Sequence, residues 1–127
     1  MRALVSASII IFILITSWLA FTSYSENTIS DLIDFTNNSL IYNVRNAEWN
    51  NAALDFNKFH KSWEEYRNVA DIFLSSESLN AVDYTLERAE NYIEVREAPA
   101  AINELAYLTE QLHFLTYNER LCLGNLF

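Results

Sequence analysis

The chain has 127 residues and a formal net charge of −9, which argues against binding to nucleic acid. Its 51% hydrophobic residues are ample for a core, while a single glycine and a single proline leave little material for the turns of a sheet or for a phosphate-binding loop. The composition therefore predicts an all-α fold in which long helices are joined by short connections.

The first predicted element is an apolar segment at the N-terminus. Arg2 is followed by an uncharged run that lasts until Glu26. At about 1.5 Å per residue, the apolar part of this run can cross the ~30 Å hydrocarbon core of a bilayer. Arg2 and the α-amino group place the N-terminus in the cytoplasm by the positive-inside rule. We therefore expect a single-pass anchor in the cell membrane over residues 1–25 and an extracytoplasmic domain over residues 26–127.

A cleaved signal peptide is the alternative for the same segment. Ser23, Tyr24 and Ser25 have the small-x-small pattern that a signal peptidase accepts. The apolar run, however, is longer than the roughly 7–15 residues of a signal-peptide core, and Trp18 and Phe21 are bulky. The sequence thus favours a retained anchor, and the alternative is a secreted helical domain. In both cases the rest of the chain is exported.

Apolar periodicity predicts four helices in the exported part. The first continues from the anchor. A kink is expected at Asn37, Asn38 and Ser39, because short polar side chains compete for backbone hydrogen bonds. The apolar positions of this helix recur at spacings of three and four residues and include Ile29, Leu32, Ile33, Leu40 and Val44.

The second predicted helix has the clearest pattern in the chain, and Asn46 is expected to be its N-cap. A seam with two apolar positions in every seven is typical of helices that pack nearly parallel, within one chain or between copies in a homo-oligomer. One series consists of Trp49, Phe56, Trp63 and Ala70, and the other of Ala52, Phe59, Tyr66 and Phe73.

The third predicted helix runs from about Glu77 to Glu97, after a polar stretch beginning at Ser75 that caps it. Pro99 is expected in the first turn of the fourth helix, where it forfeits no hydrogen bond, and Gly124 is expected to stop that helix. Short connections make sequential helices antiparallel. The predicted fold is therefore an N-terminal transmembrane helix continuing into an antiparallel up-down four-helix bundle.

The chain also resembles a known family in features that cover nearly its whole length. That family consists of small membrane-anchored proteins of Gram-positive spore-forming bacteria and is catalogued as a domain of unknown function. The resemblance implies no activity, but it implies that the partner is another integral membrane protein. It is carried by the N-terminal anchor, by Trp49-x-x-Ala52 leading into Phe56, Phe59 and Trp63, and by the closing Asn125, Leu126 and Phe127.

One position departs from the pattern of the family. Members often carry His-x-Glu at the turn between the second and third helices. Here Ser75 stands where the histidine would be, and Glu77 remains. The resemblance therefore assigns no role to this turn.

Few side chains offer catalytic or metal-binding chemistry. Glu110 and His113 form one Glu-x-x-His pattern, but a di-iron bundle needs two, facing inward, and the phase of this pair points away from the core leucines. His60 and Glu64 lie one turn apart without a second ligand pair. Cys122, the only cysteine, lies on an apolar seam and is expected to be inert. We expect no enzymatic activity, cofactor or metal site.

Glu119 is the one carboxylate at a core position by phase. Antiparallel pairing of the last two helices places it near Glu77. There it is expected to accept hydrogen bonds from free N–H groups at the helix start, or to pair with Arg67.

The leading functional hypothesis is an interaction or accessory subunit of another membrane protein. Its candidate contacts are three aromatic residues left over from the core, Tyr42, Tyr92 and Tyr107, and the C-terminal Leu126 and Phe127. All 17 acidic residues and only seven of the eight basic ones follow the anchor, so anionic lipid headgroups are expected to repel the domain.

The alternative is an extracytoplasmic module that binds a small molecule or an ion. Its signature is an inward pocket lined by Trp49, Trp63, Tyr66 and Glu119 rather than a filled core.

Overall fold

The computed structural model describes the backbone of residues 1–126 and the side chains of residues 1–117. The described backbone is helical apart from three short connections and contains no strand, which confirms the all-α prediction. The elements in chain order are α1 (Arg2–Phe35), the π-helix η1 (Thr36–Leu40), α2 (Ile41–Arg45), α3 (Trp49–Ala70), α4 (Ser76–Glu94) and α5 (Ala98–Leu126).

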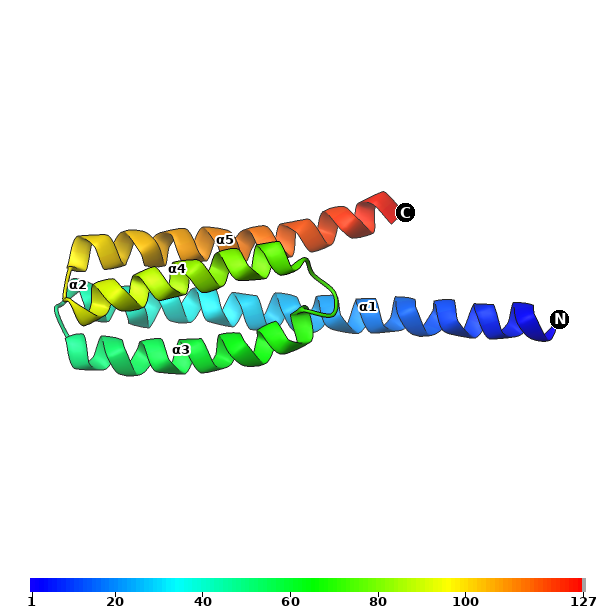
Figure 1. Cartoon of the computed structure of the whole chain (residues 1–127), viewed down its shortest axis with the longest axis horizontal. Coiled ribbons are helices and arrows are strands. Elements are labelled where there is room, and N and C mark those ends of the chain that lie inside the picture. The colour runs from blue at the N-terminus through cyan, green and yellow to red at the C-terminus, as the bar shows by residue number, and fades with distance from the viewer. Residues whose placement is uncertain (127) are drawn as a thin grey trace.

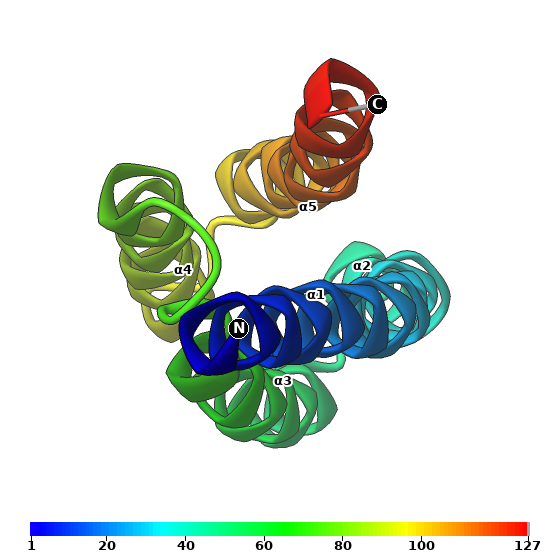
Figure 2. The ribbon, with the colours of Figure 1, turned by 90° about the vertical axis from the view of Figure 1, so that its right-hand side faces the viewer.

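The helices form an antiparallel bundle with four corners. α1, η1 and α2 are successive parts of one rod, and α3, α4 and α5 then alternate in direction (Figure 1). Viewed along the bundle, α3 lies beside α1, α4 lies between α3 and α5, and α5 closes the ring against α1 and α2 (Figure 2). This is the up-down four-helix arrangement that the short connections predict.

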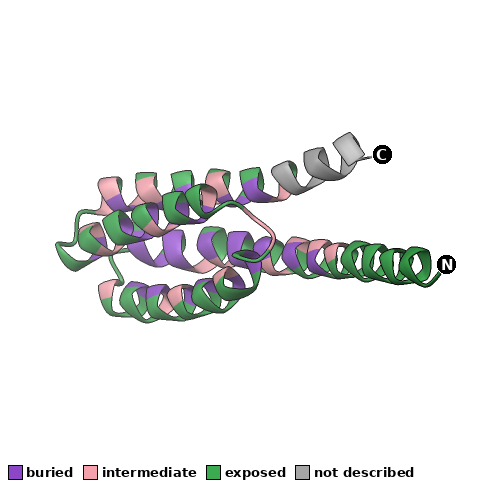
Figure 3. Cartoon of the chain, turned by 45° about the vertical axis from the view of Figure 1, so that its right-hand side comes forward, coloured by how far each residue is buried: buried purple, intermediate pink, exposed green. Residues whose placement is uncertain are grey.

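The core follows the two apolar series of α3. Trp63 and Tyr66 are completely buried at its centre, and Figure 3 shows the buried faces of all four corners turned toward one another. Each such side chain adds about 1.5–3 kcal/mol to the hydrophobic driving force. Trp49 and Phe73, at the two ends of the series, are half-buried. α5 supplies the facing layer, which consists of Ala101, Leu105, Leu108, Leu112 and Leu115.

The irregularity predicted at residues 37–39 is present as a π-helical turn. η1 adds a residue to the turn, so that Thr36 and Leu40 both face the core while Asn37 and Asn38 stay exposed. The hydroxyl of Thr36 donates to the carbonyl of Leu32 at 2.8 Å. Core residues therefore continue from α1 through η1 to α2.

Both turns at the end of the bundle away from the N-terminus are Schellman motifs built without glycine. After α2, Ala47 has φ 55°, and the amides of Ala47 and Glu48 donate to Val44 and Asn43 at 3.1 and 2.8 Å. Arg96, with φ 58°, repeats the motif after α4.

The prediction of Asn46 as the N-cap of the second helix is wrong. Asn46 is the C-cap of α2, and its side chain donates to the carbonyl of Tyr42 at 2.9 Å; Glu48 precedes α3 instead. The physical reason is the left-handed residue that follows Asn46. Ala47 ends α2 before α3 begins, and because it is not a glycine, the sequence gives no signal for this helix end.

The predicted starts of the last two helices are confirmed, and one predicted stop is wrong. The hydroxyl of Ser75 accepts a hydrogen bond from the amide of Ser78 at 3.3 Å and caps α4. Pro99 lies in the first turn of α5. Gly124 does not stop α5, whose backbone remains helical to Leu126. A single glycine disfavours a helix by only about 1 kcal/mol, and favourable neighbours can offset this.

The N-terminal half of α1 extends beyond the bundle. Every residue from Arg2 to Ala20 is exposed except the half-buried Trp18, and packing into the core begins at Phe21, four residues before the predicted boundary at residue 25 (Figure 3). Within the described residues, one helix is long and apolar enough to cross a membrane. The α3–α4 connection and the last turns of α5 lie at the same end of the bundle as this extension (Figure 1).

Candidate functional site

The aromatic residues considered for a pocket are parts of the packed core. The indole N–H of Trp63 donates to Asp83 Oδ1 at 2.7 Å, and the hydroxyls of Tyr66 and Ser25 share a hydrogen bond of 2.7 Å. Trp63 and Tyr66 are fully buried, and Trp49 is half-buried against the core. These residues therefore fill the interior, and the inward pocket that characterises the small-molecule alternative is not formed by them.

Several residues of interest lie outside the described side chains. These are Glu119, Cys122, Leu126 and Phe127. The predicted pairing of Glu119 with Arg67 thus stays a prediction. The described partners of Arg67 are Asp83, at 2.7 Å from Nε, and Asn80, at 2.6 Å from an outer guanidinium nitrogen. Together with the indole of Trp63, these contacts join α3 to α4.

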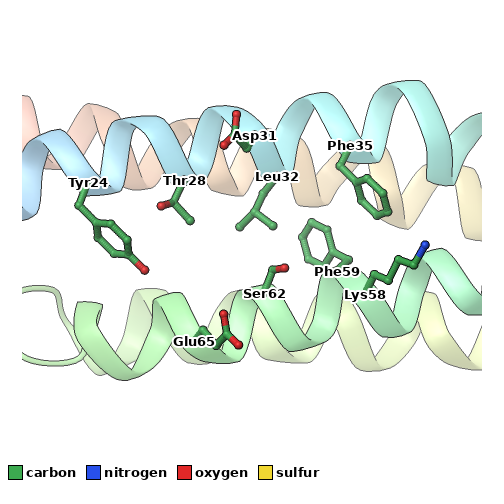
Figure 4. A pocket seen from close by; sticks show the side chains of 9 residues that line it. All are labelled: Tyr24, Thr28, Asp31, Leu32, Phe35, Lys58, Phe59, Ser62 and Glu65. Atoms are coloured by element: carbon green, nitrogen blue, oxygen red, sulfur yellow. The ribbon is translucent and has the colours of Figure 1, made fainter.

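An open groove of about 390 Å³ runs between α1 and α3 (Figure 4). Its lining includes two small side chains, Thr28 from α1 and Ser62 from α3. Tyr24 and Glu65 lie toward the N-terminal end of the groove, and Phe35 and Lys58 lie at the other end. The remaining lining residues are Asp31, Leu32 and Phe59.

A polar cluster follows the groove at its distal end. Asp55, one turn before the lining residue Lys58, accepts hydrogen bonds from the hydroxyl of Ser39 and from the amide of Asn43, the latter at 2.6 Å. Ser39 belongs to η1, so the π-helical turn is held to α3 by this carboxylate. The cluster satisfies its own polar groups and closes the bundle between α2 and α3.

The chemistry of the groove suits binding better than catalysis. Asp31, Lys58 and Glu65 are all exposed, so their charges are solvated, and none is paired with a nucleophile. A catalytic acid or base is normally tuned by burial or by a close charged neighbour. No group of three or more His, Cys, Asp or Glu residues that could hold a metal ion occurs among the residues with described side chains.

The two candidate histidine pairs lie on the surface. His60 Nε2 and Glu64 Oε1 are 3.1 Å apart on α3, and both side chains are largely exposed. Glu110 and His113 are exposed on α5, on the side away from its core leucines, as their phase predicts. Both arrangements are solvated helix faces.

The second surface feature is a stripe of three aromatic residues on α5, here called the aromatic stripe: Tyr107, Phe114 and Tyr117. They are 49%, 55% and 57% exposed, and their spacings of seven and three residues place them on one helix face. A shallow groove of about 370 Å³ adjoins Tyr107 and Phe114 between α4 and α5. The side-chain amide of Gln111 donates to the carbonyl of Ala81 at 3.2 Å and fixes the two helices beneath it.

Two of the three aromatic residues predicted to be exposed are exposed in the structure. Tyr42 and Tyr107 are exposed, whereas Tyr92 is half-buried against the core. Phe114 and Tyr117 were not among the predicted contacts. Their signal in the sequence is the leucine phase of α5, which leaves both on the outer face.

The comparisons with known proteins concern the bundle. The sequence profile of the family described as Domain of unknown function (DUF4363) matches residues 20–126. The match begins next to Phe21, the first core residue of α1, so the domain of the family includes the packed half of that helix. No curated protein and no solved structure matches the chain.

Proposed function

Because the chain belongs to the DUF4363 family, a domain of unknown function, we propose its role from its geometry: a single-pass membrane protein whose bundle docks on another integral membrane protein as an accessory subunit. The N-terminus lies in the cytoplasm and the bundle on the extracytoplasmic face, in the Gram-positive setting implied by the resemblance. The chain is a binding protein and not an enzyme in this proposal.

The observation that carries the proposal is the unbroken helix α1. Its first part is exposed and apolar, and its second part is a corner of the bundle, with no linker between them. A domain that only needs to be kept near a membrane is adequately held by a flexible linker. A helix shared by the span and the domain instead fixes the height and the orientation of the bundle. Such a fixed placement suits docking on a neighbour in the same membrane.

The aromatic stripe is the proposed docking surface. Aromatic side chains are enriched at the centres of protein interfaces, because they bury a large area at low conformational cost. Tyr107, Phe114 and Tyr117 provide such area on the outer face of α5, beside a groove that can take a side chain of the partner. The predicted contact Leu126 is the last residue of α5, and Phe127 lies outside the described residues.

The groove between α1 and α3 supports a second candidate function. Its volume of about 390 Å³ lies at the lower end of the range of small-molecule sites. Two carboxylates and one ammonium group surround an apolar floor, which suits a small ligand carrying a positive charge. The groove is open along its length, and for this reason docking is the leading proposal.

The test is recovery of partners from native membranes in mild detergent, using the full-length protein. A triple serine variant of Tyr107, Phe114 and Tyr117 is compared with a control in which Tyr42 and Tyr84, 58% and 61% exposed, are replaced by serine. The proposal expects an integral membrane protein to be recovered with wild type and control and lost with the triple variant. Recovery of no other protein contradicts it and favours the ligand-binding function. Recovery of the chain alone as a stable oligomer would show that a second copy of the chain binds the aromatic stripe.

A further inference from the structure

The end of the bundle from which α1 emerges carries an exposed apolar tip. The α3–α4 connection, residues 71–75, contains Ile72, which is 79% exposed. Apart from Met1, this is the most exposed large hydrophobic side chain of the described residues, and it exceeds every residue in the apolar run of α1. A single exposed hydrophobic side chain is common on protein surfaces, so the role of Ile72 depends on where the tip lies.

The tip is held at a defined position along α1. Phe73 stacks on Phe21 with 4.4 Å between ring centroids and an angle of 12° between ring planes, and it also contacts Trp18 at 5.9 Å. The amides of Phe73 and Leu74 both donate to the carbonyl of Ala70, at 2.9 and 2.7 Å. The connection is thus a continuation of α3 clamped against α1 at residues 18–21.

That position coincides with the edge of the bilayer if α1 spans it. From Arg2 to Phe21 the helix rises about 30 Å at ~1.5 Å per residue, which equals the hydrocarbon thickness of a typical membrane. Trp18 and Phe21 then lie at the lipid–water boundary, where aromatic side chains are favoured. Because Phe73 touches both of them, the α3–α4 connection lies at the same depth.

We propose that Ile72 inserts into the outer lipid–water interface, so that the α3–α4 connection is a second membrane contact of the bundle. This inference rests on the proposed transmembrane anchor. The occupant is lipid because the tip is continuous with the apolar surface of α1, without a basic side chain at residues 71–75. Asp71 flanks the tip, so the contact is apolar and is weakened by anionic headgroups.

The test measures depth with an environment-sensitive fluorophore on single cysteines in the full-length protein. The background is Cys122→Ser, and the protein is reconstituted in phosphatidylcholine vesicles. Ile72→Cys is compared with Val95→Cys, a 63% exposed apolar residue in the α4–α5 connection at the opposite end of the bundle. Phe12→Cys, in the apolar run of α1, reports on the anchor itself.

The expected result is specific to each position. The label at residue 72 loses fluorescence to a quencher carried by lipid near the headgroup and is blue-shifted, whereas the label at residue 95 is quenched only from the aqueous phase. The label at residue 12 is quenched by a probe deep in the bilayer. The effect at residue 72 is weaker in vesicles that contain phosphatidylglycerol.

Three other outcomes overturn the inference at different levels. If the label at residue 12 is quenched from within the bilayer but that at residue 72 is not, the tip does not touch lipid although the anchor stands. Shielding of residue 72 from the aqueous quencher without lipid quenching assigns the tip to a protein contact instead. If residue 12 is not quenched from within the bilayer, the proposed anchor itself is refuted.

Discussion

Replacing Asp83 by alanine tests the hydrogen bonds that join α3 to α4. Asp83 accepts from the indole of Trp63 and from Nε of Arg67, both at 2.7 Å. Its loss leaves the N–H of a fully buried tryptophan without this acceptor, which costs about 1–3 kcal/mol. The ion pair is 26% and 39% exposed, so solvent screening limits its share to about 0.2–1 kcal/mol. We expect a loss of about 2–3 kcal/mol in the free energy of unfolding.

A double-mutant cycle separates the tryptophan from the arginine. Trp63→Phe removes the N–H group together with part of the ring, so it is destabilising by itself. Once the indole N–H is gone, Asp83→Ala should cost only the screened ion pair. The coupling between Trp63 and Asp83 is therefore expected to be about 1–2 kcal/mol, whereas Arg67→Met alone should cost less than about 1 kcal/mol.

The measurement is urea unfolding of the full-length protein in mild detergent, followed by far-ultraviolet circular dichroism, which does not depend on the tryptophan being replaced. Asp83→Ala should lower the midpoint without changing the slope. A change within about 0.5 kcal/mol of wild type refutes the reasoning, because it places Asp83 among ordinary surface residues. Additive effects of Trp63→Phe and Asp83→Ala refute the assigned partner even if each variant is unstable.

Three further predictions concern the backbone and use the same unfolding measurement. Ala47→Gly should stabilise the protein by up to about 1 kcal/mol, because φ 55° is unfavourable for alanine, whereas Ala53→Gly in the exposed face of α3 should destabilise it by about 1 kcal/mol; equal effects of the two would contradict this. Deleting Asn38 should keep the protein folded, because η1 holds one residue more than an α-helical turn, while deleting Lys61 should unfold it by rotating the rest of α3 by about 100°. Ser75→Ala should cost about 1 kcal/mol through loss of the α4 cap, and an unchanged midpoint would show that the cap is not needed.

The parts of the fold that depend on side-chain period were predictable, and those that depend on a single backbone angle were not. Trp63 and Tyr66 lie at the centre of the core because their spacing repeats that of the apolar residues before and after them. The error at Asn46 has the opposite origin. The adjoining turn uses a left-handed alanine, and alanine normally predicts helix.

The candidate surfaces likewise include one feature that was predictable from the sequence and others that were not. That Glu110 and His113 face solvent followed from the phase of the leucines in α5. The groove between α1 and α3 could not be foreseen, because its lining residues, such as Thr28 and Ser62, come from two helices that are distant in sequence. Neither helix alone reveals which of its small residues will face the other. The membrane contact proposed for Ile72 could likewise not be predicted, because it depends on the packing of Phe73 against Phe21 of α1.

The continuous rod formed by α1, η1 and α2 acts as a lever if α1 spans the membrane. Its 44 residues extend for about 66 Å, of which more than half lies beyond the bilayer. Spanning helices change their tilt to match bilayer thickness. Over the roughly 36 Å of the bundle side, a 10° change in tilt moves the far turns by about 6 Å. A change in lipid composition that alters the bilayer thickness, and with it the tilt of α1, would thus displace the Schellman turns. The displacement would be about one helical pitch.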